Sequence, residues 1–295
     1  MRTDEAATVD LPSAAADAPV RDAACDARTQ VADEAAAAFL KTCLASQTEP
    51  VQRYLLRGRQ VWVKRAGAAH PQWPYWVLGG IARVLRLPAL APVPNRGGED
   101  AIAIEAARLR DLAARGLRVP AVLAIEPQGF LMSHLGRPGE STPSLAEEMN
   151  ERTATDSEGV LAMFCQGLDA VGLVHAAGTY LSQGFARNLV RCPDGAVGYI
   201  DFEDDPASVM SLAQCQVRDV LCYVHSAAVY LHEAGELDAG RARWKVWLEL
   251  QPTVVRALVH TSTRRMAWLR WLPSTRRFGR DLQRARAAWS LLAGG

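Results

Sequence analysis

The stretch LVHAAGTYLSQGFARNLVRCPDGAVGYIDFEDDP, residues 173–206, decides the fold class of this chain. It begins with the end of an apolar helix, and an irregular loop then leads to Asn188. Short apolar runs over residues 189–191 and 196–200 flank the turn sequence PDG, which predicts a two-stranded hairpin. Asn188 and Asp201 stand at the two outer ends of this hairpin, so we expect both side chains to face its mouth.

These two side chains offer oxygen atoms that suit a hard cation. Mg²⁺ keeps several waters and phosphate oxygens in its coordination shell and takes only one or two carboxylates from the protein. An Asn and an Asp across one hairpin therefore suit a magnesium nucleotide better than a closed cage of protein ligands. The sequence predicts that Asn188 and Asp201 bind magnesium.

This stretch resembles the catalytic loop and the metal loop of the protein-kinase-like superfamily, in particular its small bacterial branch that includes lipopolysaccharide-core sugar kinases. In that family a helix ending in Leu-His-x-x-Gly precedes a His-Gly-Asp-Leu-x-x-x-Asn loop and a hairpin ending in Ile-Asp-Phe-Gly or Ile-Asp-Phe-Glu. VHAAG (residues 174–178) is similar to the helix end, and IDFE (residues 200–203) is similar to the hairpin end. By this resemblance, Asn188 and Asp201 are the magnesium ligands.

The loop departs from the family pattern at the position of the catalytic base. Where the family has His-x-Asp, this chain has Leu181-Ser182-Gln183, so Gln183 occupies the place of the base. Glutamine cannot accept a proton from a substrate hydroxyl at neutral pH. His175 is a conceivable substitute, but its position in the family is usually structural.

Upstream, two sequence patterns predict the first strands. VQRYLLRG and RQVWVKRA, which begin at Val51, alternate in polarity and predict two strands joined by a tight turn at Arg57-Gly58. VWVK, which ends at Lys64, resembles the family strand Val-Ala-Ile-Lys, whose lysine holds the α- and β-phosphates of ATP. The glycine-rich loop of the family is absent, because Gly58 is the first glycine of the chain.

A glutamate partner for this lysine is also present. IEAARLRDLAARGLRVP predicts a helix that begins at Ile104 and has Glu105 in its first turn. The family writes this helix as Glu-x-x-x-Leu-x-x-Leu-x-x-x-Gly followed by Val-Pro, which the chain reproduces. By the resemblance, Glu105 forms an ion pair with Lys64 and orients it.

Two further strands are predicted over residues 121–125 and 129–133. The second runs into the sequence SHLG, which matches the hinge of the family. By the resemblance, backbone groups of Met132, His134 and Leu135 hydrogen-bond the adenine. We expect the His134 side chain to be a packing or hinge residue and not a general base.

The next segments are expected to support the loop. A polar linker through Thr155 leads to an amphipathic helix over residues 159–177. Asp219, in an apolar helix further on, resembles the buried aspartate that accepts N–H groups of the catalytic loop, a structural role. Asp204 and Asp205 follow the metal site, and we expect solvated turn residues there rather than added acidity at the site.

The composition is typical of a globular protein with a sizeable core. The chain has 295 residues, of which 49% are hydrophobic and 22% are charged, and its formal net charge is +1. Non-specific binding of nucleic acid needs a strong basic excess, so we expect no nucleic-acid partner. The six cysteines include no C-x-x-C pair, which predicts reduced thiols and not a metal site or a disulfide framework.

The two ends of the chain carry opposite charges. Residues 1–50 contain nine acidic and four basic residues, and no apolar stretch typical of a signal peptide follows a basic start. We expect the Ala-rich residues 1–48 to be a disordered or partly helical tail, with a helix over residues 31–45. From Arg264 onward the chain has eight arginines and one aspartate.

The basic C-terminal stretch also contains four aromatic residues: Trp268, Trp271, Phe278 and Trp289. It suits an anionic lipid surface, a phosphorylated saccharide, or docking onto the acidic N-terminal segment. A Trp- and Pro-rich segment over residues 66–100 suits either packed core or a membrane interface, with a short amphipathic helix over residues 76–87.

The predicted fold class is α+β, with a two-lobed protein-kinase-like fold that has a small antiparallel-sheet lobe and a larger, mainly helical lobe. The predicted boundaries are residues 1–48 for the acidic tail, 49–132 for the small lobe and 133–295 for the large lobe with basic C-terminal helices. The resemblance covers residues 50–230.

The resemblance implies an ATP-dependent phosphotransferase with ATP and Mg²⁺ as cofactors and with Lys64, Glu105 and Gln183 at the candidate catalytic positions. Its acceptor is expected to be a hydroxyl of a lipid-linked sugar or of a protein, in the cytoplasm or at the inner face of an anionic membrane. Alternatively, Gln183 makes the protein a pseudokinase, which is a nucleotide-binding or scaffolding module. A third hypothesis is a reversed nucleotide pose that transfers a different part of the nucleotide to a protein hydroxyl.

Overall fold

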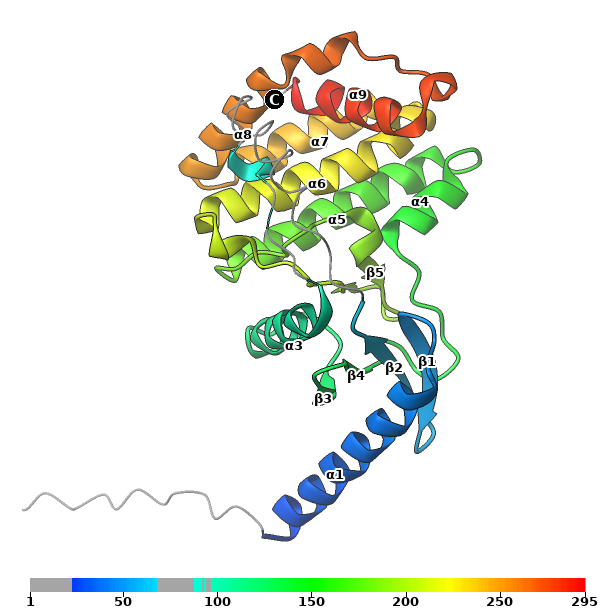
Figure 1. Ribbon diagram of the computed structural model, residues 1–295. Helices are drawn as coiled ribbons and strands as arrows, with labels where there is room; N and C mark the ends of the chain where they lie inside the picture. Colours follow the sequence, from blue (N-terminus) through cyan, green and yellow to red (C-terminus); the bar gives the residue numbers. More distant parts are fainter. Residues whose placement is uncertain (1–22, 68–87, 92, 94–96, 295) are drawn as a thin grey trace, which may run out of the picture.

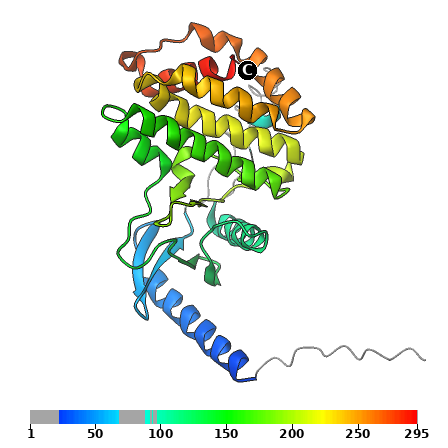
Figure 2. The same cartoon turned by 180° about the vertical axis from the view of Figure 1, so that it is seen from behind.

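The computed structural model describes residues 23–67, 88–91, 93 and 97–294, and the predicted helix over residues 76–87 lies outside this part. Figures 1 and 2 show a small sheet flanked by helices at one end of the molecule and a body of stacked helices at the other. The sheet is antiparallel and most other elements are helices, so the predicted α+β class is confirmed.

The sheet forms where the alternating sequence patterns predicted strands. The strands are β1 (Val51–Leu56), β2 (Arg59–Arg65), β3 (Val122–Glu126) and β4 (Gly129–Ser133). Their spatial order is β1-β2-β4-β3, and all neighbours are antiparallel. Arg57 and Gly58 join β1 to β2 with φ values of 51° and 73°, the left-handed conformation that a two-residue hairpin turn requires.

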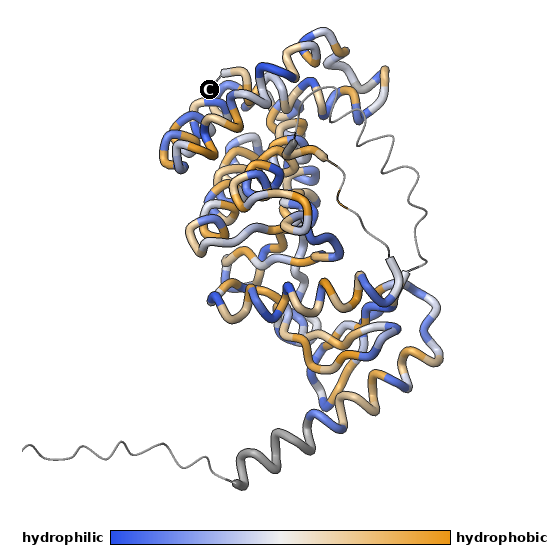
Figure 3. Tube along the Cα trace, turned by 60° about the vertical axis from the view of Figure 1, so that its left-hand side comes forward, coloured by the Kyte–Doolittle hydropathy of each residue, from blue (hydrophilic) through white to orange (hydrophobic). Residues whose placement is uncertain are grey.

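Helix α1 (Ala23–Ser46) packs on the sheet and is longer than the predicted helix over residues 31–45. Its residues Ala36, Leu40 and Cys43 are buried in one core cluster with side chains of β2 and β4. Figure 3 shows hydrophobic residues along the part of α1 that lies next to the sheet. The second half of the segment expected as a tail is therefore part of the sheet core, because the sheet supplies the apolar partner that this Ala-rich helix needs.

Helix α3 (Gly98–Ala114) packs against β3 and β4. It begins at Gly98 and not at Ile104, so Glu105 lies in the middle of the helix and the prediction of a first-turn position is wrong. In the structure Glu99 and Asp100 occupy the first turn, where acidic side chains interact favourably with the helix dipole.

The remaining helices form a helical body. They are α4 (Leu145–Arg152), α5 (Ser157–Ala176), α6 (Leu212–Glu233), α7 (Leu237–Glu249), α8 (Thr253–Arg265) and α9 (Arg280–Leu292). Helix α6 is central, because it contacts all the others. The fully buried Tyr223 of α6 donates a hydrogen bond of 2.8 Å to the carbonyl oxygen of Phe164 in α5, which satisfies its polar hydroxyl inside the core.

Helix α4 lies in the segment predicted to be a polar linker, so that prediction is wrong for this part. The Ser144 side chain accepts a hydrogen bond from the Glu147 N–H at 3.2 Å, and the Glu147 carboxylate accepts one from the Ser144 N–H at 2.8 Å. This reciprocal pair is a capping box that fixes the start of the helix. The pattern Ser-x-x-Glu in the sequence was sufficient to predict it.

Helix α5 is long and apolar enough to cross a membrane by length and composition. Half of its most apolar window is buried inside the protein, and the helix packs against α4, α6 and α7. A core helix of a globular protein has the same composition, so this single helix is weak evidence for a membrane span.

The cysteine side chains in the described part are free thiols: Cys43, Cys165, Cys192, Cys215 and Cys222. Four of these five are buried. Burial raises the pKa of Cys222 to about 12, so this thiol stays protonated and unreactive at neutral pH. The arrangement agrees with the prediction of reduced cysteines.

Candidate functional site

The loop between α5 and β5 (Leu189–Arg191) is anchored by a buried aspartate of α6, as the resemblance predicted. Asp219 is fully buried, and its Oδ2 accepts a hydrogen bond of 2.6 Å from the Leu181 N–H. The same oxygen lies 3.4 Å from Nε2 of His175. This contact holds the His175 ring against α6, which supports a structural role for His175.

Two arginines bind carbonyl groups of the same loop. Arg108 of α3 donates to the carbonyl oxygen of Tyr180 at 2.7 Å and lies over the Tyr180 ring at 4.1 Å. Arg218 of α6 donates to the carbonyl oxygen of Ser182 at 3.2 Å. The loop is therefore held from the sheet side and from the helical body at the same time.

Gly184 allows the loop to pass directly over α6. A Cβ atom at this position would lie 2.7 Å from the backbone carbonyl oxygen of Asp219, closer than real Cβ atoms approach. Any larger residue would push the loop away from the helix that anchors it. The requirement for glycine comes from this tertiary contact.

Asn188 and Asp201 lie at the mouth of the predicted hairpin, which β5 forms with β6 (Val197–Tyr199). The Ile200 N–H donates to the carbonyl oxygen of Asn188 at 3.0 Å, so the two segments stay paired beyond the strands. The Asn188 amide nitrogen donates to the carbonyl oxygen of Gln183 at 3.2 Å, which leaves the amide oxygen for a ligand. Asp201 has a φ of 72°, a strained conformation that occurs at functional sites.

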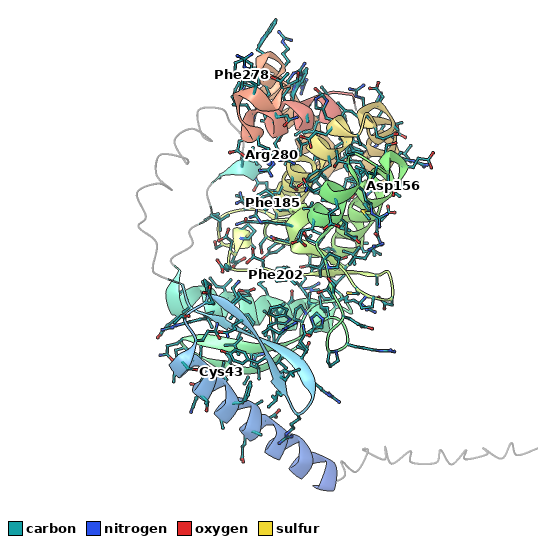
Figure 4. The ribbon with its side chains drawn as sticks, turned by 90° about the vertical axis from the view of Figure 1, so that its right-hand side faces the viewer. Cys43, Asp156, Phe185, Phe202, Phe278 and Arg280 are labelled. Carbon is teal, nitrogen blue, oxygen red and sulfur yellow. The ribbon has the colours of Figure 1, made fainter. Side chains whose placement is uncertain are left out.

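Lys64 of β2 forms the predicted ion pair with Glu105 of α3. The distance from Nζ to Oε2 is 2.6 Å, and the two residues are only 8% and 2% exposed. The other carboxylate oxygen of Glu105 accepts a hydrogen bond of 3.3 Å from the Phe202 N–H. Phe202 lies between the sheet and the helical body in Figure 4, so Glu105 connects β2, α3 and the end of the hairpin.

Two more carboxylates surround Lys64. Its Nζ lies 3.1 Å from Asp201 and 2.9 Å from Glu203, so one ammonium faces three carboxylates, with a net charge of −2. Burial alone lowers the pKa of Lys64, but the three carboxylates outweigh burial and raise the pKa above its ordinary value. Burial also raises the pKa of Glu105, although Lys64 opposes this. The excess negative charge favours a bound cation.

The geometry of these carboxylates is compatible with a metal ion. One oxygen each from Glu105, Asp201 and Glu203 lies within 4.8 Å of the other two. Carboxylate and amide oxygens are the ligands that Mg²⁺ prefers in proteins. Glu203 belongs to the IDFE motif but was not a predicted site residue, because the motif does not indicate the direction of its side chain.

A cavity of about 460 Å³ contains this site, between the sheet and the helical body. It is lined by all the predicted site residues except Gln183: Lys64, Glu105, Met132, His134, Leu135, Asn188 and Asp201. Its volume is in the range of small-molecule sites. A larger hollow of about 1130 Å³ between α5 and α7 is lined by none of the predicted site residues, so we assign the site to the smaller cavity.

The segment after β4 contributes a rigid wall to the cavity. Nδ1 of His134 accepts a hydrogen bond of 3.2 Å from the Trp62 indole N–H, and its Nε2 lies 3.0 Å from the Glu140 carbonyl oxygen. The ring is thus a packing residue, as predicted, and not a base. The Leu135 N–H makes no hydrogen bond with any residue that the structure describes, so it is available to a ligand.

Gln183 lies beside a carboxylate. Its amide nitrogen donates a hydrogen bond to Asp204, which is only 7% exposed. The expectation that Asp204 is a solvated turn residue is therefore wrong. Asp205 is half-buried and accepts a hydrogen bond of 2.7 Å from the Tyr180 hydroxyl. The sequence could not reveal the contact of Gln183 with Asp204, because 21 positions separate the two residues.

Arg187 is a second residue that the sequence analysis missed. It lines the cavity next to Asn188, and its guanidinium lies 4.4 Å from the centre of the Phe185 ring. It is exposed, so it adds a positive charge at the rim of the cavity. An arginine directly before the predicted magnesium ligand was the pattern that could have indicated it.

No model of a known protein family matches this chain, and no curated protein sequence matches it either. The function proposed below rests on the geometry of the site and on the resemblance of its motifs.

Proposed function

We propose that this protein is an ATP-dependent phosphotransferase with a two-lobed protein-kinase-like fold, and that it transfers a phosphoryl group to a hydroxyl of a lipid-linked sugar or of a protein. One observation carries the proposal: the ion pair of Lys64 and Glu105 meets Asn188 and Asp201 in one cavity of about 460 Å³. These residues come from four separate segments. Their order and roles follow the kinase-like resemblance.

The lining of the cavity suits a nucleotide. The apolar side chains of Val190 and Ile200 are proposed to contact the adenine, and the free Leu135 N–H is proposed to donate to a ring nitrogen. Lys64 is proposed to hold the α- and β-phosphates, with Glu105 keeping the ammonium group in position. Each proposed contact uses a residue that lines the cavity or pairs with one.

Asn188 and Asp201 are proposed to hold Mg²⁺, with Glu203 as a further ligand. An ion held there would neutralise the negative charge that develops during phosphoryl transfer. The chain supplies oxygen atoms on a hairpin that is paired up to Ile200, so the ligands need little rearrangement. The net negative charge of the site favours this binding.

We propose Asp204 as the base in the transfer step. Gln183 cannot take the proton of an acceptor hydroxyl, but the carboxylate that Gln183 contacts can. In the proposed step the hydroxyl oxygen attacks the γ-phosphorus, its proton passes to Asp204, and ADP leaves. The transition state is loose, so positioning and charge neutralisation supply most of the acceleration.

A second candidate function is that of a pseudokinase, which binds the nucleotide or a partner without transfer. The amide of Gln183 at the position of the base favours it. In that case Asp204 is only the hydrogen-bond acceptor that fixes Gln183. The phosphotransferase requires access to ATP, so the proposed location is the cytoplasm, including the inner face of the membrane.

The first experiment is calorimetric titration of the full chain with ATP, with and without Mg²⁺. We expect magnesium-dependent binding that Lys64→Ala and Asp201→Ala both abolish. Asp238→Asn is the matched control, because Asp238 is an exposed carboxylate of α7 outside the cavity. Circular dichroism checks that the variants stay folded, and a wild type that does not bind ATP would disprove the proposal.

The second experiment separates the two functions. Asp204→Asn should keep the affinity for magnesium ATP but reduce the release of labelled γ-phosphate to acceptor or water by about 100-fold, the usual contribution of a general base. Asp238→Asn again serves as the control. Equal turnover by Asp204→Asn and the wild type would exclude Asp204 as the base, and ATP binding without any turnover by the wild type would favour the pseudokinase.

A further inference from the structure

The stretch that joins α8 to α9 exposes large apolar side chains. Trp268, Trp271 and Phe278 are 49%, 77% and 62% exposed. They belong to two short 3-10 turns, η4 (Ala267–Trp271) and η5 (Arg276–Phe278). Figure 4 shows Phe278 at the end of the helical body that points away from the sheet. Several large exposed rings on one short stretch indicate an interaction site.

The same stretch is strongly basic. Residues 264–280 contain six arginines and no acidic residue. Arg264, Arg270 and Arg277 are exposed, and none of them forms an ion pair with a residue in the described ranges. The guanidinium of Arg270 lies 4.8 Å from the centre of the Trp271 ring, so a cation and an aromatic ring are presented together.

The described part of the acidic N-terminal segment does not cover this stretch. Helix α1 packs on β2, β3 and β4. Figure 1 shows α1 at the opposite end of the molecule from α8 and α9. The prediction that the acidic N-terminal segment docks on the basic C-terminal stretch is therefore wrong for helix α1. The acidic residues of α1 do not neutralise these arginines.

We propose that this aromatic-basic surface, made of Trp268, Arg270, Trp271, Arg277 and Phe278, binds the face of an anionic phospholipid membrane. Each arginine near an anionic bilayer strengthens binding about fivefold. Tryptophan and phenylalanine rings enter the interface between headgroups and acyl chains. A protruding tip fits a bilayer, whereas single-stranded nucleic acid needs a groove in which bases stack.

The inner side of the same stretch contacts the anchored loop. Met266 and Leu269 line an apolar cavity of about 220 Å³ together with Phe185, which follows Gly184 in the anchored loop. The contact links the inner side of η4 to the loop that carries Gln183. Membrane binding at the outer side of η4 is proposed from its exposed rings and its charge, and it does not depend on the proposed phosphotransferase function.

The test is flotation of the full chain with phosphatidylcholine vesicles, with and without about one third of anionic phosphatidylglycerol. The wild type should bind the anionic vesicles, and high salt should release it, because the screening length falls from about 10 Å at 0.1 M to about 3 Å at 1 M. Trp271→Ala/Phe278→Ala should weaken binding at least about tenfold through the loss of buried apolar area. Arg270→Glu/Arg277→Glu should weaken it at least about twentyfold.

Matched controls lie on the sheet side of the molecule. Leu55→Ala removes an apolar side chain that is 66% exposed. Arg53→Glu/Arg110→Glu changes the net charge by the same amount as the arginine variant of the surface, at two exposed positions. Both controls should bind the vesicles as the wild type does, because neither touches the aromatic-basic surface.

Equal vesicle binding by the wild type and both surface variants would overturn the proposal. Tighter binding to soluble heparin than to vesicles would also overturn it and would assign the surface to a polyanionic polymer. Dimer formation that Trp271→Ala/Phe278→Ala abolishes, without vesicle binding, would instead assign the surface to a second copy of the chain. The test uses no nucleotide, so its outcome is independent of the outcome for the phosphotransferase.

Discussion

Replacement of Lys64 by methionine removes the ammonium group that faces three carboxylates. The ammonium lies 2.6 Å from Glu105, 3.1 Å from Asp201 and 2.9 Å from Glu203. Asp201 and Glu203 have side chains that are 41% and 42% exposed, so they remain hydrated in the variant. Glu105 is 2% exposed and would be left as an unpaired buried charge. Breaking a buried pair in this way costs about 3–5 kcal/mol, and we expect Lys64→Met to lower the free energy of unfolding by this amount at about pH 8.

The loss should be smaller in acid. Burial raises the pKa of Glu105 and Lys64 lowers it, so removal of Lys64 moves the pKa further above its ordinary value. A carboxyl with a raised folded pKa contributes stability that is fully present below its unfolded pKa of about 4.3 and is lost as the pH rises through the folded pKa. Protonation of Glu105 in the folded variant should therefore make the loss of stability smaller at about pH 5 than at about pH 8.

Urea unfolding at the two pH values, followed by tryptophan fluorescence, measures these free energies. The control is Lys64→Met/Glu105→Leu, which removes both charges and should recover most of the stability, because apolar replacements of buried ion pairs are often neutral. The account is refuted if Lys64→Met unfolds within about 0.5 kcal/mol of the wild type at both pH values, or if the double variant is less stable than the single one.

Three further changes test the loop, an acid-sensitive group and the N-terminal helix. Gly184→Ala places a Cβ atom 2.7 Å from the carbonyl oxygen of Asp219. We therefore expect it to lower the free energy of unfolding by about 1–3 kcal/mol and to weaken ATP binding measured by calorimetry. The control Gly67→Ala, whose Cβ atom would contact no neighbouring atom, should change neither the stability nor the ATP binding. Burial lowers the pKa of His225, so stability is present above its unfolded pKa of about 6.5 and is lost as the pH falls through the folded pKa. His225→Gln should reduce the loss of unfolding free energy in acid, measured by urea unfolding at several pH values. An equal loss in the variant and the wild type would contradict this prediction. Leu40→Ala should cost about 2–5 kcal/mol in urea unfolding if α1 is part of the sheet core, and a cost below about 1 kcal/mol would show that it is not.

Local sequence patterns determined the elements whose structure depends on near neighbours. The alternation in β1 and β2 and the turn at Arg57-Gly58 gave the first hairpin, because strand period and a left-handed turn are properties of a few adjacent residues. The hairpin of β5 and β6 followed from the PDG turn in the same way. Helix starts were predicted less well, since α3 begins at Gly98 and not at Ile104, and the capping box of α4 was not used.

The sequence motifs alone also identified most residues of the candidate site. Lys64 and Glu105 form an ion pair, and Asp219 anchors the loop at Leu181. Both contacts could be predicted, because the resembled family has these residue types in the same order along its sequence. The order of motifs carries this information. It does not say which further side chains reach the site.

Those side chains depend on tertiary structure alone. Asp204 contacts Gln183 because the chain after β6 returns over the anchored loop, and Glu203 reaches Lys64 because the same segment leaves the hairpin at the strained Asp201. No periodicity links positions that are 21 residues apart.

The sequence by itself thus determined the hairpins and the α+β class, because both depend on local backbone preference. It also determined which motif residues pair, because their order along the chain is that of the resembled family. Only the tertiary structure decided that Asp204 is buried beside Gln183 and that the arginines and aromatic rings around Trp271 face solvent at one end of the helical body. Burial and proximity between distant segments come from how the whole chain packs, and no short stretch of sequence contains that information.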